Sequence, residues 1–331
     1  MEPVYVITGV TGFLGHTVAK KLFDQNKTVV GLKLPEDNSQ LLPGVTYAEG
    51  DVTKPESLDQ LADLANGREI ILIHCAAIIS IQSKTTNMYD VNVGGVKNIL
   101  AFCEKYKISR LIHVSSVHAI PESPKGTVMT ETKDFSPEKV TGNYAKTKAE
   151  ATALVFRAAS HGLNASIVHP SGIIGPDDTT GGYLTETIRA FVNGKFPCAV
   201  AGGYDFVDVR DVADGVISCI EKGRAGENYI LSGRFITVKE LFGILSEILG
   251  RKAPKITVPL PIVRLISPLA EKIERANGSP ILITPYSTYT LGSNGLFSHE
   301  KATRELGYSS RPIEKALRDT VEWLTENKKR D

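Results

Sequence analysis

The residues best suited to chemistry are a tyrosine and a lysine, four positions apart in the middle of the chain. They fall in the run Tyr144-Ala145-Lys146-Thr147-Lys148, and on a helix this spacing places both side chains on one face. A phenol with a usual pKa of about 10 exchanges protons poorly at neutral pH. A nearby ammonium group favours the phenolate and lowers that pKa, so the pair is suited to acid–base work on a bound oxygen.

A further hydroxyl group follows a β-rich run. Leu111–Val114 has the composition of a strand, and Ser115 and Ser116 come directly after it. At the end of a strand, a serine hydroxyl can hydrogen-bond the same substrate oxygen as the phenol. Because a Tyr-x-x-x-Lys pair also arises by chance, this strand end carries much of the argument.

Near the start, a glycine-rich turn links an apolar run to an amphipathic segment. After Val4–Ile7, the turn reads Thr8-Gly9-Val10-Thr11-Gly12-Phe13-Leu14-Gly15. In a strand–turn–helix unit, Gly9 makes the turn, Gly12 lets the backbone approach a pyrophosphate, and Gly15 lets helix pack on strand. The helix N-terminus attracts an anion. The sequence therefore predicts a dinucleotide site, although Gly-rich turns of other α/β proteins share the pattern.

Short β-rich runs alternate with amphipathic stretches along the first half, which predicts parallel strands joined by right-handed crossovers. The pattern indicates an α/β fold with a Rossmann-type doubly wound parallel sheet, whose ligand lies beyond the carboxyl ends of the strands. The expected strands are Val4–Ile7, Thr28–Leu32, Val45–Ala48, Ile70–His74, Leu111–Val114 and Ala165–Val168, and the expected helices include Pro55–Ala65, Val91–Lys105 and Ile313–Leu324.

The composition changes after Pro176, where Gly, Pro and Thr become frequent. We expect a dinucleotide-binding domain over residues 1–176, with a returning segment near 204–230. Residues 177–203 and 231–331 are expected to form a smaller, loop-rich substrate-binding lobe. A chain of 331 residues suits two parts, because single cores stop growing near about 250–300 residues.

Charge and cysteine usage favour an enzyme of small molecules. The formal net charge is +1, so neither nucleic acid nor an anionic membrane is indicated as a partner. The four cysteines lie far apart without a Cys-x-x-Cys pair, which indicates a reduced compartment and no metal site. No signal-like segment precedes the first expected strand, and Ile70–Ile81 is too short to span a bilayer, so we expect a cytoplasmic protein.

In this order, the glycine motif, the strand ending in Ser-Ser and the Tyr-x-x-x-Lys pair resemble the extended short-chain dehydrogenase/reductase superfamily, which includes NAD-dependent epimerases and dehydratases. The resemblance covers nearly the whole chain. Further landmarks match at Gly50-Asp51-Val52, His74-Cys75-Ala76-Ala77, Val91–Asn98, His169-Pro170, Gly175-Pro176, Asp205–Ala213 and Glu305–Tyr308.

The resemblance implies a nicotinamide cofactor and a catalytic trio. Tyr144 would donate a proton to a carbonyl oxygen, Lys148 would hold the nicotinamide ribose and lower the Tyr144 pKa, and Ser116 would polarise the oxygen. Ser115 is the alternative to Ser116. Asp51 would bind the adenine amine, with Val52 against the ring. The expected cofactor contacts are Gly9, Thr11, Gly12, Phe13, Leu14, Gly15, Lys33, Asp51, Val52, Ala76, Ala77, Tyr144, Lys148 and Pro170.

Departures from the family pattern narrow the expected reaction. Dehydratases carry Asp-Glu after the active hydroxyl, where this chain has Val117-His118. Nucleotide-sugar epimerases usually carry asparagine and arginine where this chain has Gly172 and Tyr204, and without that arginine a diphosphate loses its bidentate partner. What remains resembles dihydroflavonol 4-reductases, 3β-hydroxysteroid dehydrogenases and aldehyde reductases. The expected substrate is a ketone, aldehyde or alcohol; a nucleotide-sugar epimerase and a non-catalytic NAD(P)-binding sensor remain alternatives.

The end of the second expected strand bears on cofactor choice. Lys33 suits the 2′-phosphate of NADP, although Leu34 occupies the place where the reductases typically have arginine. We expect NADP, with NAD as the alternative. Family analogy also suggests a homodimer through Asn87–Lys105 and Tyr144–Ala159. The expected substrate-pocket residues are Val117, His118, Tyr183 and Tyr204.

Overall fold

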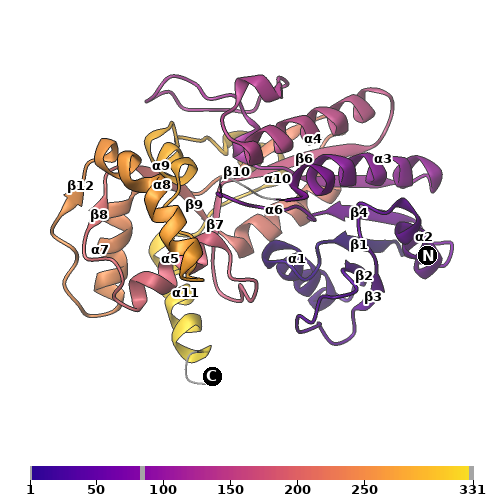
Figure 1. Cartoon of the computed structure of the whole chain (residues 1–331). Coiled ribbons are helices and arrows are strands. Elements are labelled where there is room, and N and C mark those ends of the chain that lie inside the picture. Colours follow the sequence, from indigo (N-terminus) through magenta and orange to yellow (C-terminus); the bar gives the residue numbers. More distant parts are fainter. Residues whose placement is uncertain (1, 83–85, 328–331) are drawn as a thin grey trace.

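Seven parallel strands form the main sheet of the protein (Figure 1). The computed structural model describes residues 2–82 and 86–327. The strands lie in the order β10-β6-β5-β4-β1-β2-β3, and the order reverses between β1 and β4, where ligands of such sheets bind. The bounds are β1 (Val4–Thr8), β2 (Thr28–Lys33), β3 (Thr46–Glu49), β4 (Ile70–His74), β5 (Arg110–Val114), β6 (Ala165–Pro170) and β10 (Asn228–Leu231). The predicted doubly wound α/β sheet is confirmed.

Helices cover both faces of this sheet, which explains why its central strands are apolar throughout. One face packs against α1 (Phe13–Asp24), α6 (Val209–Lys222) and α10 (Glu300–Leu306). The other face packs against α2 (Asp59–Ala65), α3 (Gly95–Lys105) and α4 (Asn143–Ser160). The short helical turns η1 (Pro55–Leu58) and η2 (Asp90–Gly94) lead into α2 and α3.

The remaining elements form a smaller unit with its own apolar core, called the second lobe here. Its prolines begin helices as well as interrupt them: Pro261 lies in the first turn of α8, and Pro285 begins α9. Pro fits the first turn because the N–H groups there lack helical partners, so the lobe holds more helix than its proline content suggested. Its elements are β7 (Gly172–Ile174), α5 (Tyr183–Val192), β8 (Ala199–Val200), β9 (Gly203–Asp208), β11 (Arg234–Thr237), α7 (Val238–Ile248), β12 (Thr257–Val258), α8 (Leu260–Ala276), α9 (Pro285–Gly292) and α11 (Ile313–Asn327).

No helix within the described residues has the length and apolar character needed to cross a membrane.

The chain passes between the main sheet and the second lobe over very short connections. Ser171 alone separates β6 from β7, β9 leads directly into α6, and Ser232-Gly233 separate β10 from β11. The hydrogen-bonded sheets place β7 and β9 with the smaller sheet, and β10 with the main sheet. Because the chain crosses between the two sheets several times, the expected domain boundary at residue 176, with a returning segment near 204–230, stays a prediction.

The glycine-rich turn has the geometry that its sequence predicts. Gly9 has φ +66°, a left-handed conformation that favours glycine. The Gly12 N–H donates to the Gly9 carbonyl at 3.1 Å and closes the turn. A Cβ at Gly15 would collide with the Gly9 carbonyl oxygen. Glycine at position 15 therefore lets α1 approach the turn that leaves β1.

We expect Gly15→Ala to lower the free energy of unfolding by about 1–3 kcal/mol, because the added methyl group must displace backbone. The matched control is Gly243→Ala in α7, where a Cβ meets nothing within 4 Å. That control should gain roughly 0.5–1 kcal/mol from helix propensity. Urea unfolding of both variants measures the difference, and equal stabilities would contradict the packing role of Gly15.

Candidate active site

Helix α4 carries both Tyr144 and Lys148 at its start. Gly142, the residue before the first residue of α4, has φ +99°, a conformation that favours glycine. A Cβ there would also collide with the ring of Tyr286 from α9. One glycine thus ends the loop and leaves room for an aromatic ring above the helix start.

Ser116 lies beside Tyr144, whereas Ser115 points elsewhere. The Ser116 hydroxyl lies close enough to the Tyr144 phenol to act on its pKa, and it accepts the His118 N–H at 3.2 Å. The Ser115 Oγ instead lies 2.6 Å from Thr152 Oγ1 of α4. Of the two candidate serines, the structure therefore brings Ser116 together with the tyrosine.

Lys148 is buried beneath the same site. Its Nζ donates to the Val114 carbonyl at the end of β5, at 2.7 Å. Burial lowers the pKa of Lys148 to about 8, while the Cys75 thiol acts in the opposite direction. The lysine is thus fixed by backbone, with its charge held in a dry environment.

The acidity of Tyr144 differs from the expectation. Burial raises its pKa to about 12, and only the hydrogen bond with Ser116 acts to lower it. The expected decrease from Lys148 is not found: the Lys148 ammonium binds the Val114 carbonyl, and desolvation of the phenolate is the main influence on the Tyr144 pKa. In this state Tyr144 is a protonated phenol, the form that can donate a proton.

His118 joins the two parts of the protein directly above Tyr144. Its Nε2 lies 2.8 Å from the Tyr204 hydroxyl, and its Nδ1 lies 3.1 Å from the Tyr286 hydroxyl. Its ring meets the Tyr144 ring edge-on, with centroids 5.8 Å apart. Burial lowers the pKa of His118 to about 4. A neutral imidazole has one donor and one acceptor nitrogen, so one phenol donates to it and the other accepts from it.

Three of the four predicted pocket residues gather here, and the fourth is engaged elsewhere. Val117, His118 and Tyr204 line a small hollow of about 50 Å³. The Tyr183 hydroxyl instead donates to the Leu282 carbonyl at 2.9 Å.

Tyr286 also belongs to this cluster and is not among the residues predicted from the sequence. It lies in the first turn of α9, where Thr284 and Ser287 cap each other reciprocally. The signal available in the sequence was this capping pattern, Thr-Pro-Tyr-Ser, which marks a helix start. Nothing in that pattern points to a residue as distant in sequence as His118.

The glycine turn offers the features that a dinucleotide phosphate needs. Gly12 is the N-cap of α1, and no side chain caps this helix within the described part of the chain. Its first-turn N–H groups are therefore available to an anion. Ala76 packs tightly on this turn, since a Cβ at Gly9 would lie 2.8 Å from its Cα. Also near the turn, the Thr11 side chain hydrogen-bonds Asp37.

Other predicted cofactor residues lie at strand ends or at the start of α1. Pro170 ends β6, and Phe13 and Leu14 begin α1. Ala77 follows β4 by three residues, as a residue bordering a ligand beyond the strand ends would.

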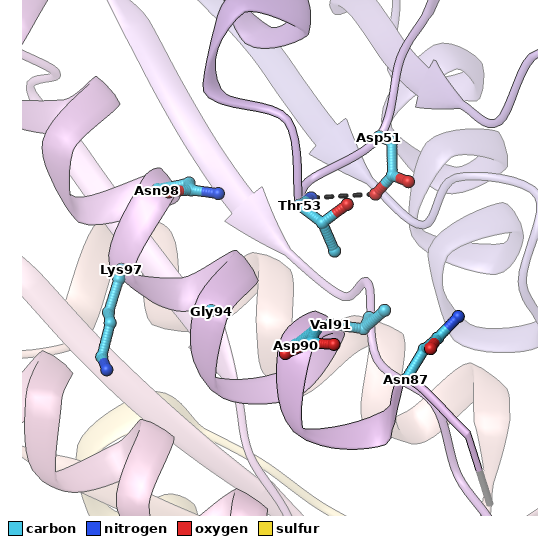
Figure 2. Close-up of a pocket in the computed structure, with 8 residues that line it drawn as sticks. All are labelled: Asp51, Thr53, Asn87, Asp90, Val91, Gly94, Lys97 and Asn98. Atoms are coloured by element: carbon cyan, nitrogen blue, oxygen red, sulfur yellow. Dashed lines mark hydrogen bonds between the residues drawn. The ribbon is translucent and has the colours of Figure 1, made fainter.

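A hollow of about 480 Å³ adjoins Asp51, and Figure 2 shows the residues around it. Asp51 accepts the Thr53 N–H at 2.8 Å with one carboxylate oxygen. Val52 is buried, and its carbonyl accepts from Asn98 Nδ2 at 2.8 Å. Val52 does not line the hollow, so its expected contact with the adenine ring stays a prediction. The hollow is lined by Asp51, Thr53, Asn87, Asp90, Val91, Gly94, Lys97 and Asn98.

Lys33 has a partner that the sequence did not reveal. Its Nζ lies 2.8 Å from Glu49 Oε1, because Lys33 of β2 pairs in register with Glu49 of β3. The carboxylate offsets the lysine charge. The Glu49 side chain is 60% exposed, so it can turn toward solvent.

Known proteins resemble the chain along almost its full length. The model of the "NAD dependent epimerase/dehydratase family" matches residues 5–232. "Sterol demethylase protein B" of Methylococcus capsulatus is 29% identical, over 97% of this chain and 98% of that protein. The 4-hydroxy-2-methyl-3-oxo-4-farnesyl-3,4-dihydroquinoline-1-oxide ketoreductase of Stigmatella aurantiaca is 28% identical, over 92% of this chain and 91% of that protein.

A solved structure agrees in fold. The crystal structure of gox2253 superimposes with a TM-score of 0.85 at 30% identity, covering 98% of this chain and 99% of that chain. The family match spans more than half of the chain, and it includes the glycine turn, Ser116, Tyr144 and Lys148. The chain therefore belongs to the NAD dependent epimerase/dehydratase family, within the extended short-chain dehydrogenase/reductase superfamily.

Proposed function

We propose that the protein is a nicotinamide-dependent oxidoreductase that interconverts a ketone or aldehyde and an alcohol. The observation that carries this proposal is the buried Ser116 hydroxyl beside the buried Tyr144 phenol, one helical turn from the ammonium of Lys148, whose Nζ donates to the Val114 carbonyl. Two hydroxyl groups that converge in a dry site can bind and protonate one carbonyl oxygen.

The residues divide the work as follows. Ser116 orients the substrate oxygen, and Tyr144 gives it a proton in reduction or removes one in oxidation. Lys148 holds the nicotinamide ribose, and Gly12 and the first turn of α1 hold the diphosphate. When bound, the cofactor supplies or accepts the hydride. Burial keeps the pKa of Tyr144 high, so the phenol stays protonated and ready for the reductive direction.

An apolar carbonyl compound is the substrate class that we favour. Apolar side chains, among them Val117, Ile120 and Phe297, form much of the lining of the hollow beside His118, together with polar residues such as Glu122 and Asn294. Two relatives are named for a sterol and for a farnesyl-bearing quinoline. The epimerase alternative is weaker, because Tyr204 stands where a diphosphate-binding arginine is expected and is occupied with His118.

For the cofactor we propose NADP over NAD. Lys33 is the cation at the end of β2, and a 2′-phosphate can compete for it with the exposed carboxylate of Glu49. The pairing with Glu49 makes this preference smaller than a free lysine would give.

The function is tested with a panel of apolar ketones, aldehydes and alcohols and both cofactors, read by nicotinamide absorbance. We expect reduction of at least one ketone or aldehyde, and loss of about 10²- to 10⁴-fold in turnover in Tyr144→Phe. The affinity for the cofactor should stay within about twofold, because Tyr144 acts on the substrate oxygen.

Tyr106→Phe is the control for this experiment. Tyr106 follows α3, and its hydroxyl contacts Asp59 of α2, so this variant should leave turnover unchanged. Epimerisation of nucleotide sugars without carbonyl reduction would favour the epimerase. Stoichiometric cofactor binding without any turnover would favour the sensor, and appreciable turnover by Tyr144→Phe would contradict the proton-donor role.

The His118 cluster generates a prediction about the substrate. In Tyr286→Phe, kcat/KM should fall roughly 2- to 10-fold, the range for one lost hydrogen bond, with no change in cofactor affinity. Tyr106→Phe is again the control, because its hydroxyl contacts Asp59 of α2 and not the His118 cluster. Steady-state kinetics with the best substrate of the panel measures both variants. Equal kcat/KM values in the two would remove Tyr286 from the pocket.

Cofactor choice gives a separate prediction. Glu49→Gln should raise the ratio of kcat/KM for NADPH over NADH by about 2- to 5-fold, because it frees Lys33 from an exposed ion pair worth about 0.2–1 kcal/mol. Lys33→Glu should lower the same ratio. Initial rates with both cofactors give the ratios, and a ratio unmoved by either change would exclude this pair from cofactor selection.

A further inference from the structure

Helix α8 presents a row of large apolar side chains to solvent. Leu265 is 82% exposed and Leu269 is 61% exposed, far more than apolar residues in a packed helix. The members fall at positions i, i+3, i+4, i+7 and i+11, so they share one side of the helix. We call this row the α8 apolar face; it consists of Ile262, Leu265, Ile266, Leu269 and Ile273.

The opposite side anchors α8 to the protein. Val263, Ser267 and Glu271 recur every four residues and are all buried. The Glu274 carboxylate accepts the N–H groups of Leu282 and Ile283 at 2.9 and 3.2 Å. Because these contacts fix the rotation of the helix, the α8 apolar face is held outward. Figure 1 shows α8 beside α9 on the second lobe.

The charges around the α8 apolar face have one sign. Arg264 and Lys272 lie on α8 and are exposed, and Lys252 and Lys255 are exposed in the segment that precedes the helix in the sequence. The acidic residues of the helix are turned inward: Glu271 is buried and paired with Arg275, and Glu274 binds the backbone described above. No exposed carboxylate lies among residues 251–277, all of which the structure describes. The overall charge of +1 hides this local excess.

We propose that the α8 apolar face docks on an anionic lipid surface, with the helix lying in the plane of the interface. An apolar row bordered by cations matches the boundary between acyl chains and anionic headgroups. A second copy of the chain fits less well, since a symmetric interface through this face would bring Lys272 and Arg264 toward their own equivalents. The docking departs from the expectation, based on net charge, that no membrane is a partner.

The position of α8 connects the lipid surface with the candidate site. It packs on α9, and α9 carries Tyr286, whose hydroxyl lies against His118. Docking would therefore bring the membrane within one helix of the residues above Tyr144. The docking itself depends on α8 alone, so it is tested without any assay of turnover.

Flotation of the full-length protein with lipid vesicles tests the proposal. Vesicles of phosphatidylcholine with phosphatidylglycerol should carry the protein, and vesicles of phosphatidylcholine alone should carry much less. Leu265→Glu with Leu269→Glu should weaken binding roughly tenfold or more, and Lys272→Glu should weaken it on anionic vesicles only. Val128→Glu is the control, since Val128 is an exposed apolar residue outside α8 and should float like the wild type.

Both substituted leucines are exposed, so the double variant should keep its fold, which circular dichroism and the thermal midpoint check. Light scattering in solution gives the oligomeric state. Failure of the wild type to float, or equal flotation of the double variant, would overturn the proposal. A wild-type dimer that the double variant dissociates would overturn it in favour of a second copy.

Discussion

The attachment of α4 to the end of β5 is the constraint on which the site depends. The Lys148 ammonium donates to the Val114 carbonyl, and Ser115 meets Thr152 one turn further along the helix. Both contacts are buried, where an unpaired polar group would be costly. They fix the height and rotation of α4, and Tyr144 consequently faces the serine that follows on the same strand.

The buried amide of Asn92 also fixes α4. Asn92 of η2 bonds the backbone of Ile78 through both its oxygen and its nitrogen, and it also donates to Thr147. The loop after β4, which borders the predicted nucleotide site, is thereby tied to the helix of the predicted acid. Stability and site geometry share these bonds, so a change that loosens one disturbs the other.

The sequence was sufficient where the determinants are local. Alternating strands and helices, the glycine turn and the Tyr144–Lys148 spacing are all set within a few residues, and each is found as expected. The rest depends on partners far away in the chain. Tyr286 reaches His118 across 168 positions, and Glu49 meets Lys33 only because β3 lies beside β2. The expected decrease in the Tyr144 pKa was also wrong, because the spacing of two residues in the sequence does not show how deeply the phenol is buried.

Three of the passages between the main sheet and the second lobe are very short, and they restrict how the protein moves. Connections of zero to two residues leave little backbone for a hinge, so opening by rotation of whole lobes is disfavoured. Each crossing is also bonded, as where Ser171 donates to Asp205 at 2.5 Å. Ligand entry is then expected to depend on local displacement of single elements, on the scale of loop motion, more than on rotation of a whole lobe.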